Sequence, residues 1–200
     1  GNINDINDSY EIFKQIFTRH SPTEWLDNDV LLDYSNAISR FRPDLLPVGI
    51  RLNVQVNLFL RTIDRFDKYK LNIIKNSIGC FGLTEYQAGV LSGLKINTYF
   101  SEVNDGYILE PHIDDYKNWI SQGTTADYIL IFAKNKLTKQ VSIFLCKFSE
   151  ISNMLERENK VGPRVCDYLD VAKIEIISNI KLNKESILLG TKTIKREKLL

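Results

Sequence analysis

Apolar side chains in the first third of the chain recur every three to four residues, which is the period of an amphipathic helix. This pattern predicts helices over residues 10–19, 27–41, 47–66 and 69–75. Ser9 is placed to cap the first helix, and Pro47 suits the first turn of the third, where a missing N–H costs nothing. Residues 1–76 are therefore expected to form a helical domain.

From Ile78 onward the hydrophobic period changes to two, which is typical of half-buried β-strands. The alternating or continuous apolar runs after the first short strand at Ile78 lie at residues 94–100, 107–110, 126–133, 139–148 and 165–182, the last counted as two strands. Asn104-Asp105-Gly106 predicts a tight hairpin turn. Short strands at regular spacing indicate a small antiparallel β-barrel or sandwich over residues 77–190, so the predicted fold class is α+β.

The composition argues against several classes of partner. The chain has 26 Lys and Arg against 25 Asp and Glu, which provides no electrostatic argument for nucleic acid or an anionic membrane. No apolar run approaches the roughly 18 residues that would span a bilayer. Three distant cysteines without a CxxC motif disfavour a disulfide framework and a zinc site, and favour a reducing compartment. No metal is predicted, and three polar residues able to bind one are expected to be solvated: His112, Asp114 and Asp115.

Two polar stretches with glycines, residues 84–93 and 117–123, stand out between the strands. Considered alone, each is most simply a structural loop, because glycine and hydroxyl residues are frequent in loops. On the same grounds Glu85 is expected to be solvated. Trp119 is expected to be a core residue, because a large aromatic side chain buries much apolar area.

The order of these motifs resembles the acyl-CoA dehydrogenase and acyl-CoA oxidase superfamily. Residues 82–89 read Gly-Leu-Thr-Glu-Tyr-Gln-Ala-Gly, and a hairpin then precedes Lys-Asn-Trp-Ile-Ser-Gln-Gly at 117–123. Residues 80–85, Cys-Phe-Gly-Leu-Thr-Glu, look like the oxidase segment Cys-Phe-Ala-Met-Thr-Glu. Downstream, residues 182–190 end in Leu-Leu-Gly, as the family's middle domain does. The resemblance covers roughly residues 47–190.

The resemblance implies FAD-dependent oxidation of an acyl-CoA thioester to the trans-2-enoyl-CoA. The residues that it assigns to FAD are Phe81, Leu83, Thr84, Gly89, Val90, Trp119 and Ser121. By this match the first three would contact the isoalloxazine, and the amides of Gly89 and Val90 would remain for the pyrophosphate. Trp119 would pack beside the ring, and Ser121 would reach towards flavin N5.

In this family the catalytic glutamate comes from a C-terminal helical domain, of which residues 191–200 would be the start. No catalytic residue is therefore assigned here, and the 200-residue piece is expected to be inactive. The resemblance also implies an acyl-CoA substrate, an electron acceptor that is either O2 or an electron-transferring flavoprotein, and a homo-oligomer formed through the C-terminal domain. A mitochondrial or peroxisomal location follows from the resemblance alone.

Two alternatives remain open at this point. Val90 and Leu91 stand where the family usually has a serine and an acidic or amide residue. A degenerate member of the family could therefore keep the fold without tight FAD binding and act as a binding or scaffold module. The second alternative is an unrelated helical-plus-β interaction domain in which both motifs are coincidental. Flavin bound to the purified protein would separate the enzyme from the degenerate member.

Overall fold

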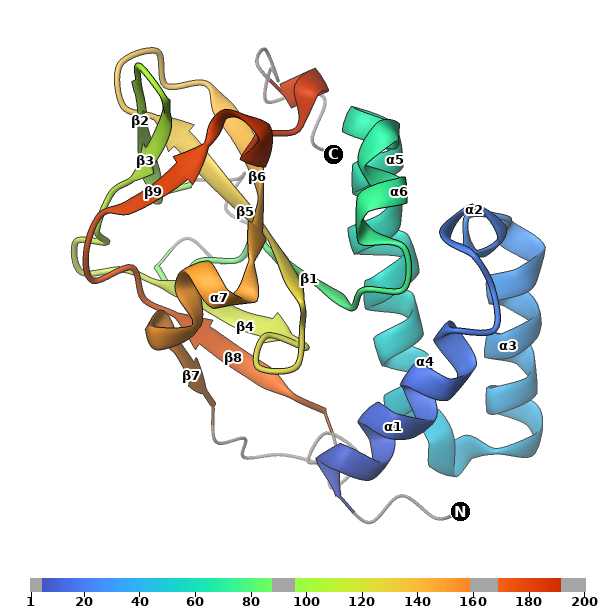
Figure 1. Cartoon of the computed structure of the whole chain (residues 1–200). Helices are drawn as coiled ribbons and strands as arrows, with labels where there is room; N and C mark the ends of the chain where they lie inside the picture. Colours follow the sequence, from blue (N-terminus) through green and yellow to red (C-terminus); the bar gives the residue numbers. More distant parts are fainter. Residues whose placement is uncertain (1–4, 88–95, 159–168, 192–200) are drawn as a thin grey trace.

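The computed structural model describes residues 5–87, 96–158 and 169–191, with a helical part packed against one side of a β part (Figure 1). The helices are α1 (Ile6–Phe17), α2 (Pro22–Trp25), α3 (Asn28–Phe41), α4 (Leu46–Asn53), a π-helical segment (Val54–Leu60), α5 (Arg61–Asp67), α6 (Leu71–Ile74) and α7 (Phe148–Ile151). Short 3-10 turns lie at Pro43–Leu45, Lys68–Lys70, Ser152–Met154, Lys184–Ser186 and Leu189–Thr191. None of the described helices is both long enough and apolar enough to cross a membrane.

Side-chain caps set where the first helices begin. Asp5 caps α1, so the helix starts one turn earlier than predicted. Ser9, the predicted cap, lies inside α1 and is buried, and its hydroxyl accepts a hydrogen bond from Arg51 Nε at 3.0 Å. The unpredicted helix α2 has a capping box in which Ser21 and Glu24 satisfy each other's backbone N–H groups.

The strands are β1 (Gly79–Gly82), β2 (Tyr99–Val103), β3 (Gly106–Leu109), β4 (Lys117–Ser121), β5 (Tyr128–Asn135), β6 (Val141–Lys147), β7 (Leu155–Arg157), β8 (Val171–Ile174) and β9 (Ile180–Asn183). The larger sheet runs β1-β5-β2-β3-β9, with β6 also paired to β5, and the smaller sheet runs β4-β8-β7. Most pairs are antiparallel, but β1 and β2 both pair with β5 in parallel. The predicted α+β class is confirmed, and the sheet is mixed.

Strand β5 is buried on both faces, which is why its sequence is continuously apolar rather than alternating. Leu130 and Phe132 belong to the core that the helices cover. Ile129 and Ile131 belong to a second core shared with the strands of the smaller sheet. The β5–β6 pair is therefore a middle layer between the helices and β4-β8-β7 (Figure 1).

The helical part meets β1 at Gly79. A Cβ atom at this position would lie 2.2 Å from the ring of Phe59, so only glycine permits the approach. Gln55 accepts a hydrogen bond from Gly79 N at 2.8 Å, and its Nε2 donates to Ser77 O at 3.0 Å. Phe59 and Gln55 both belong to the π-helical segment, a type of helix that is frequent at functional sites. This segment therefore fixes the start of β1.

Several predicted boundaries shift in the structure. The last N-terminal helix ends at Ile74 and the first strand begins at Gly79, in agreement with the change of period. The helices and β5 share one core, so the division into domains stays a prediction. The strand predicted at 94–100 starts at Tyr99 among the described residues. The stretch predicted as a loop at 117–123 is largely the strand β4.

Candidate functional site

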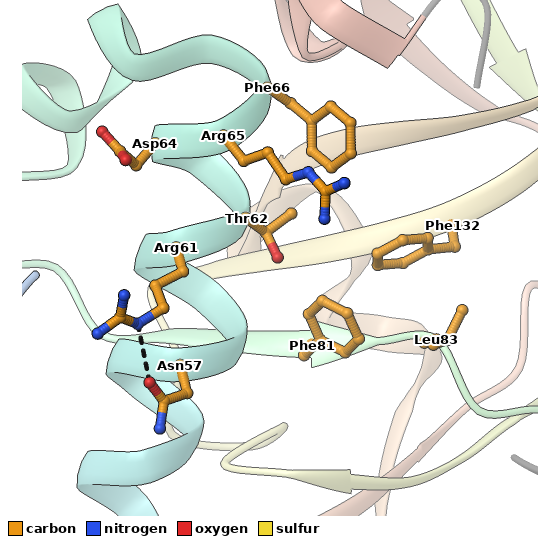
Figure 2. A pocket seen from close by; sticks show the side chains of 9 residues that line it. All are labelled: Asn57, Arg61, Thr62, Asp64, Arg65, Phe66, Phe81, Leu83 and Phe132. Carbon is orange, nitrogen blue, oxygen red and sulfur yellow. Dashed lines mark hydrogen bonds between the residues drawn. The ribbon is translucent and has the colours of Figure 1, made fainter. Parts of the chain in front are cut away.

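A cleft of about 430 Å³ lies between α5 and the end of β1 (Figure 2). Its walls are Asn57, Arg61, Thr62, Asp64, Arg65, Phe66, Phe81, Leu83 and Phe132. Phe81 and Leu83 are alternate residues of an extended chain, so both side chains face the helix. The ring of Phe81 lies 4.7 Å from that of Phe132 on β5. Two of the residues assigned to FAD by resemblance therefore form the apolar floor of a cavity.

The rim of this cleft carries cationic groups from the helix. Arg61 is held by a hydrogen bond from its Nε to Asn57 Oδ1 at 2.9 Å. The guanidinium of Arg65 lies over the ring of Phe66, with 5.4 Å between its Cζ and the ring centroid. Arg61 also donates to Asn28 Oδ1 at 2.5 Å. In Figure 2 both Arg61 and Asp64 point away from Phe81, so Arg65 is the cationic group on the side of the apolar floor. An apolar floor under a cationic rim suits a ligand with an apolar and an anionic part.

The chain beyond Leu83 pairs with β4. Thr84 O accepts a hydrogen bond from Asn118 N at 2.9 Å. The register of β4 then shifts between Lys117 and Ile120, and within this bulge Trp119 has a φ of +54°. Positive φ is strained for a bulky residue and is typical of functional sites. Trp119 is 60% exposed, so the expectation of a core residue was wrong.

Three of the FAD-assigned residues present polar groups without protein partners. Neither the hydroxyl nor the N–H of Thr84 has a hydrogen-bond acceptor in the part of the chain that the structure describes. Within the same described ranges the Ser121 hydroxyl and the Trp119 indole N–H are also without partners. Polar groups normally bond to protein, water or ligand. These donors are therefore available to a ligand at the β1–β4 junction, next to the cleft but outside its walls.

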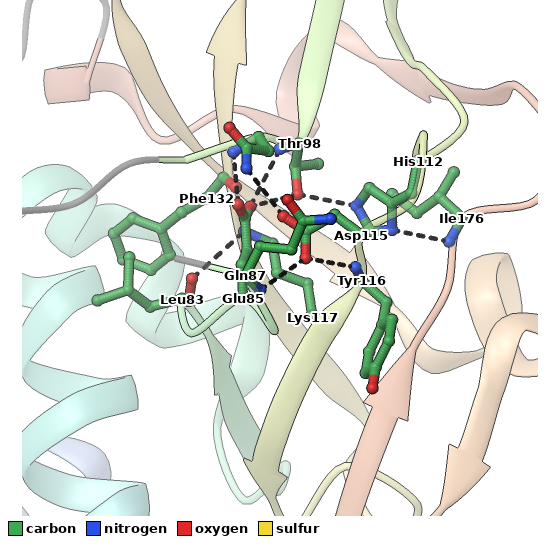
Figure 3. A network of polar contacts seen from close by, with 11 residues as sticks. Leu83, Glu85, Gln87, Thr98, His112, Asp115, Tyr116, Lys117, Phe132 and Ile176 are labelled. Atoms are coloured by element: carbon green, nitrogen blue, oxygen red, sulfur yellow. Dashed lines mark hydrogen bonds and ion pairs between the residues drawn. The ribbon is translucent and has the colours of Figure 1, made fainter. Parts of the chain in front are cut away.

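A buried ion pair lies directly behind this junction (Figure 3). Glu85 is 2% exposed, and its carboxylate accepts a hydrogen bond from the ammonium of Lys117, which is fully buried, at 2.7 Å. Thr98 donates to the same carboxylate through its hydroxyl at 2.7 Å and through its N–H at 3.0 Å. Burial raises the pKa of Glu85, but Lys117 and these hydrogen bonds outweigh it, so the pKa falls below its ordinary value. The expectation that Glu85 is solvated was wrong.

Lys117 is a buried residue of the site to which no sequence motif assigned a role. Burial lowers its pKa, and Glu85 counteracts that effect. Its ammonium also donates to Phe132 O at 2.7 Å and, at 3.4 Å, to Leu83 O. Lys117 is the first residue of β4 and lies opposite Glu85, so two opposite charges in paired segments were the available signal.

Asp115 joins Gln87 to Asn97 through its carboxylate. Its carboxylate accepts hydrogen bonds from Gln87 N at 3.2 Å and from Asn97 Nδ2 at 2.9 Å. Only 4% of Asp115 is exposed, so it is not a solvated loop residue as expected. Gly89 and Val90, which the resemblance assigns to the pyrophosphate, lie outside the described residues.

His112 extends the buried network in one defined tautomer. Its Nδ1 accepts a hydrogen bond from Ile176 N at 3.2 Å, so the ring proton is on Nε2, which lies 2.9 Å from Thr98 Oγ1. Burial and the charge of Lys117 lower the pKa of His112 to about 4, although Glu85 and Asp115 counteract them. The expectation of a solvated His112 was therefore also wrong.

The free energy of unfolding is expected to fall by about 2 kcal/mol between pH 7 and pH 5 because of His112. Its ordinary pKa is 6.5, so the unfolded chain binds a proton in this range, whereas the folded chain, with a pKa of about 4, does not. The contribution of His112 to the free energy of unfolding is thus complete above pH 6.5 and is lost as the pH falls towards 4. Urea unfolding at both pH values measures the difference. In His112→Gln the decrease should be smaller by this amount; an equal decrease in both proteins would refute the assignment.

Comparison of the sequence with known families finds no family model that matches the chain. A local match relates it to acyl-coenzyme A oxidase 2 of Candida tropicalis, with 35% identity over 85 residues, which make up 36% of this chain and 12% of that protein.

Solved structures match over nearly the whole chain. Butyryl-CoA dehydrogenase from Megasphaera elsdenii has a TM-score of 0.59 and 18% identity, over 96% of this chain and 61% of that one. Glutaryl-CoA dehydrogenase from Mycobacterium smegmatis, in complex with FADH2, has a TM-score of 0.59 and 16% identity, over 97% and 57%. The chain thus spans less than two thirds of each of these proteins.

The chain has the fold of the acyl-CoA dehydrogenases, and the predicted resemblance to the acyl-CoA dehydrogenase and oxidase superfamily is confirmed. The alternative of an unrelated interaction domain with coincidental motifs is inconsistent with this fold. At these levels of identity the structural matches establish the fold, and the activity has to be argued from the site.

Proposed function

We propose that this chain forms one side of the flavin site of an FAD-dependent acyl-CoA dehydrogenase or oxidase. The observation that carries the proposal is the group of unpartnered donors on Thr84, Trp119 and Ser121 at the β1–β4 junction. They lie next to a cleft whose floor includes Phe81 and Leu83. The sequence resemblance assigns all five residues to FAD.

The residues present fit a flavin at this junction. An isoalloxazine needs a hydrogen-bond donor at its polar edge and flat apolar contact on its ring faces. Thr84 offers an N–H and a hydroxyl, and Trp119 offers a large exposed aromatic side chain on a strained bulge. When bound, FAD would accept a hydride from Cβ of the acyl-CoA and so form the trans-2-enoyl-CoA.

The protein groups act on this chemistry through electrostatics and exclusion of water. The donors of Thr84 would stabilise negative charge at the flavin edge, because fixed dipoles need no reorganisation during the reaction. Phe81, Leu83 and Phe132 would keep water out of the adjoining cleft. The guanidinium of Arg65, beside the apolar floor of the cleft, would favour the anionic part of an acyl-CoA.

The base that removes the α-proton is proposed to lie outside the described residues. Glu85, the acidic residue nearest the site in sequence, is buried and already accepts hydrogen bonds from Lys117 and Thr98. It therefore lacks a free oxygen aimed at a substrate. As in the family, we propose a glutamate from a C-terminal helical domain, which would also form the homo-oligomer interface.

Two further features are proposed on resemblance. The electron acceptor is O2 or an electron-transferring flavoprotein, and the location is mitochondrial or peroxisomal. The degenerate alternative, a scaffold without flavin chemistry, predicts that the unaltered protein does not bind FAD. A titration of the protein with FAD therefore decides between the flavoenzyme and the scaffold.

Thr84→Val is expected to weaken FAD binding by about five- to tenfold, because it removes one hydroxyl donor worth about 1 kcal/mol without changing the shape of the side chain. Quenching of flavin fluorescence during titration of the full natural chain gives the dissociation constant. Thr138→Val, at the β5–β6 turn, is the matched control and should bind like the unaltered protein. Equal affinities for Thr84→Val and the control would exclude a role for this hydroxyl.

A further inference from the structure

The parallel ladder between β1 and β5 stops at Gly82, two residues before Thr84. Its register runs from Gly79 opposite Tyr128 to Gly82 opposite Ile131. One further step would pair the N–H of Thr84 with the carbonyl of Phe132, following the regular spacing of a parallel ladder. In the structure that carbonyl accepts its hydrogen bond from the ammonium of Lys117 at 2.7 Å instead. The side chain of Lys117 thus takes the place of a backbone donor.

Lys117 also orients the peptide between Leu83 and Thr84. Its ammonium lies 3.4 Å from the Leu83 carbonyl oxygen, which therefore points towards the buried pair (Figure 3). This peptide is trans, because the described chain contains no cis bond, so its N–H points the opposite way. The N–H of Thr84 is consequently directed away from Lys117. Throughout the described ranges no protein group accepts a hydrogen bond from it.

We propose that Lys117 is a positioning residue that ends the β1–β5 ladder and presents the N–H of Thr84 to the flavin. The inference rests on the proposed function, because the flavin is the ligand that this N–H would meet. Glu85 acts together with Lys117: its carboxylate oxygen lies 2.7 Å from Lys117 Nζ, and Thr98 fixes this carboxylate through two hydrogen bonds. The carboxylate of Glu85 serves as the counter-ion of Lys117 and takes no part in removing a proton from the substrate.

Because the Glu85–Lys117 pair is buried, a single substitution cannot separate positioning from folding. Removing one charge leaves the other buried without a partner, and the protein then loses stability for reasons unrelated to flavin. Removing both, as in Glu85→Gln/Lys117→Met, keeps the side-chain volumes and is far better tolerated. The double variant therefore separates positioning from folding. Glu110→Gln/Lys136→Met is a matched control, because that ion pair has the similar length of 2.8 Å but is largely exposed.

The first test compares FAD affinity in the two double variants of the full natural chain. Glu85→Gln/Lys117→Met should fold, as judged by its circular dichroism, yet bind FAD at least about tenfold more weakly than the control, with a shifted absorption maximum of the bound flavin. A purely structural role predicts normal affinity and an unchanged spectrum once folding is retained. That result would overturn the proposal.

A second test needs no substitution and so cannot fail through unfolding. In the 15N-labelled, unaltered protein, the amide proton of Thr84 should exchange with water rapidly without FAD and become protected when FAD is added. An amide that is already protected, or that stays unprotected with FAD bound, would contradict the proposal. If the unaltered protein does not bind FAD at all, the proposed function fails; if FAD binds and only Thr84 is unaffected, the inference alone fails.

Discussion

Lys117→Met is expected to lower the free energy of unfolding by about 3–5 kcal/mol, the usual cost of breaking a buried ion pair from one side. Glu85 would remain 2% exposed with a carboxylate that has lost its cation. The carbonyl of Phe132 would lose its donor at the same time. Urea unfolding at pH 7, with the linear dependence on denaturant, measures the change.

Two companions show whether this loss comes from the uncompensated charge. Glu85→Gln/Lys117→Met should recover most of the stability, since no buried charge remains. Lys136→Met breaks the exposed pair with Glu110 and should cost less than about 1 kcal/mol. If Lys117→Met were no more destabilising than Lys136→Met, the Glu85–Lys117 pair would not be the buried contact described here.

Phe59→Ala is expected to cost about 3–5 kcal/mol, because it leaves a cavity where the π-helical segment packs on β1. Phe59 is fully buried, and its ring occupies the space directly above Gly79. The junction cannot close over the cavity easily, because Gln55 fixes the same backbone through Gly79 N. Thermal or urea unfolding of the variant gives the loss.

Phe41→Ala is the control for this substitution. Phe41 ends α3 and is 78% exposed, so the same truncation should change the free energy of unfolding by less than about 0.5 kcal/mol. Similar losses for Phe41→Ala and Phe59→Ala would mean that Phe59 does not fill the helix–strand junction.

The hydrophobic pattern predicted most helices and strands, because the spacing of apolar residues reflects which face of a helix or strand is buried. The helix predicted at 27–41 is α3, and the apolar run at 126–133 is β5, buried on both faces. Other features escaped because local chemistry overrode the pattern. Asp5 rather than Ser9 caps α1, and the bulge at Trp119 breaks the alternation of β4, so that this strand resembled a loop.

The assignment of residues to FAD stays a prediction, whereas the electrostatics around them were not predicted at all. Motif order singled out Thr84, Trp119 and Ser121, which the structure places on two paired segments. Burial of charge could not be foreseen, since an isolated Glu85 or His112 is normally solvated. Here Glu85 is buried and His112 is partly buried, because partners from other parts of the chain, Lys117 and Thr98, satisfy them.

We propose above that this chain holds FAD at the β1–β4 junction. Titration of the full natural chain with FAD, followed by flavin fluorescence, tests this site most directly. We expect saturable binding with one FAD per chain, weakened by Thr84→Val and unchanged by Thr138→Val. The absence of saturable binding, or binding that Thr84→Val leaves intact, would contradict the proposed site.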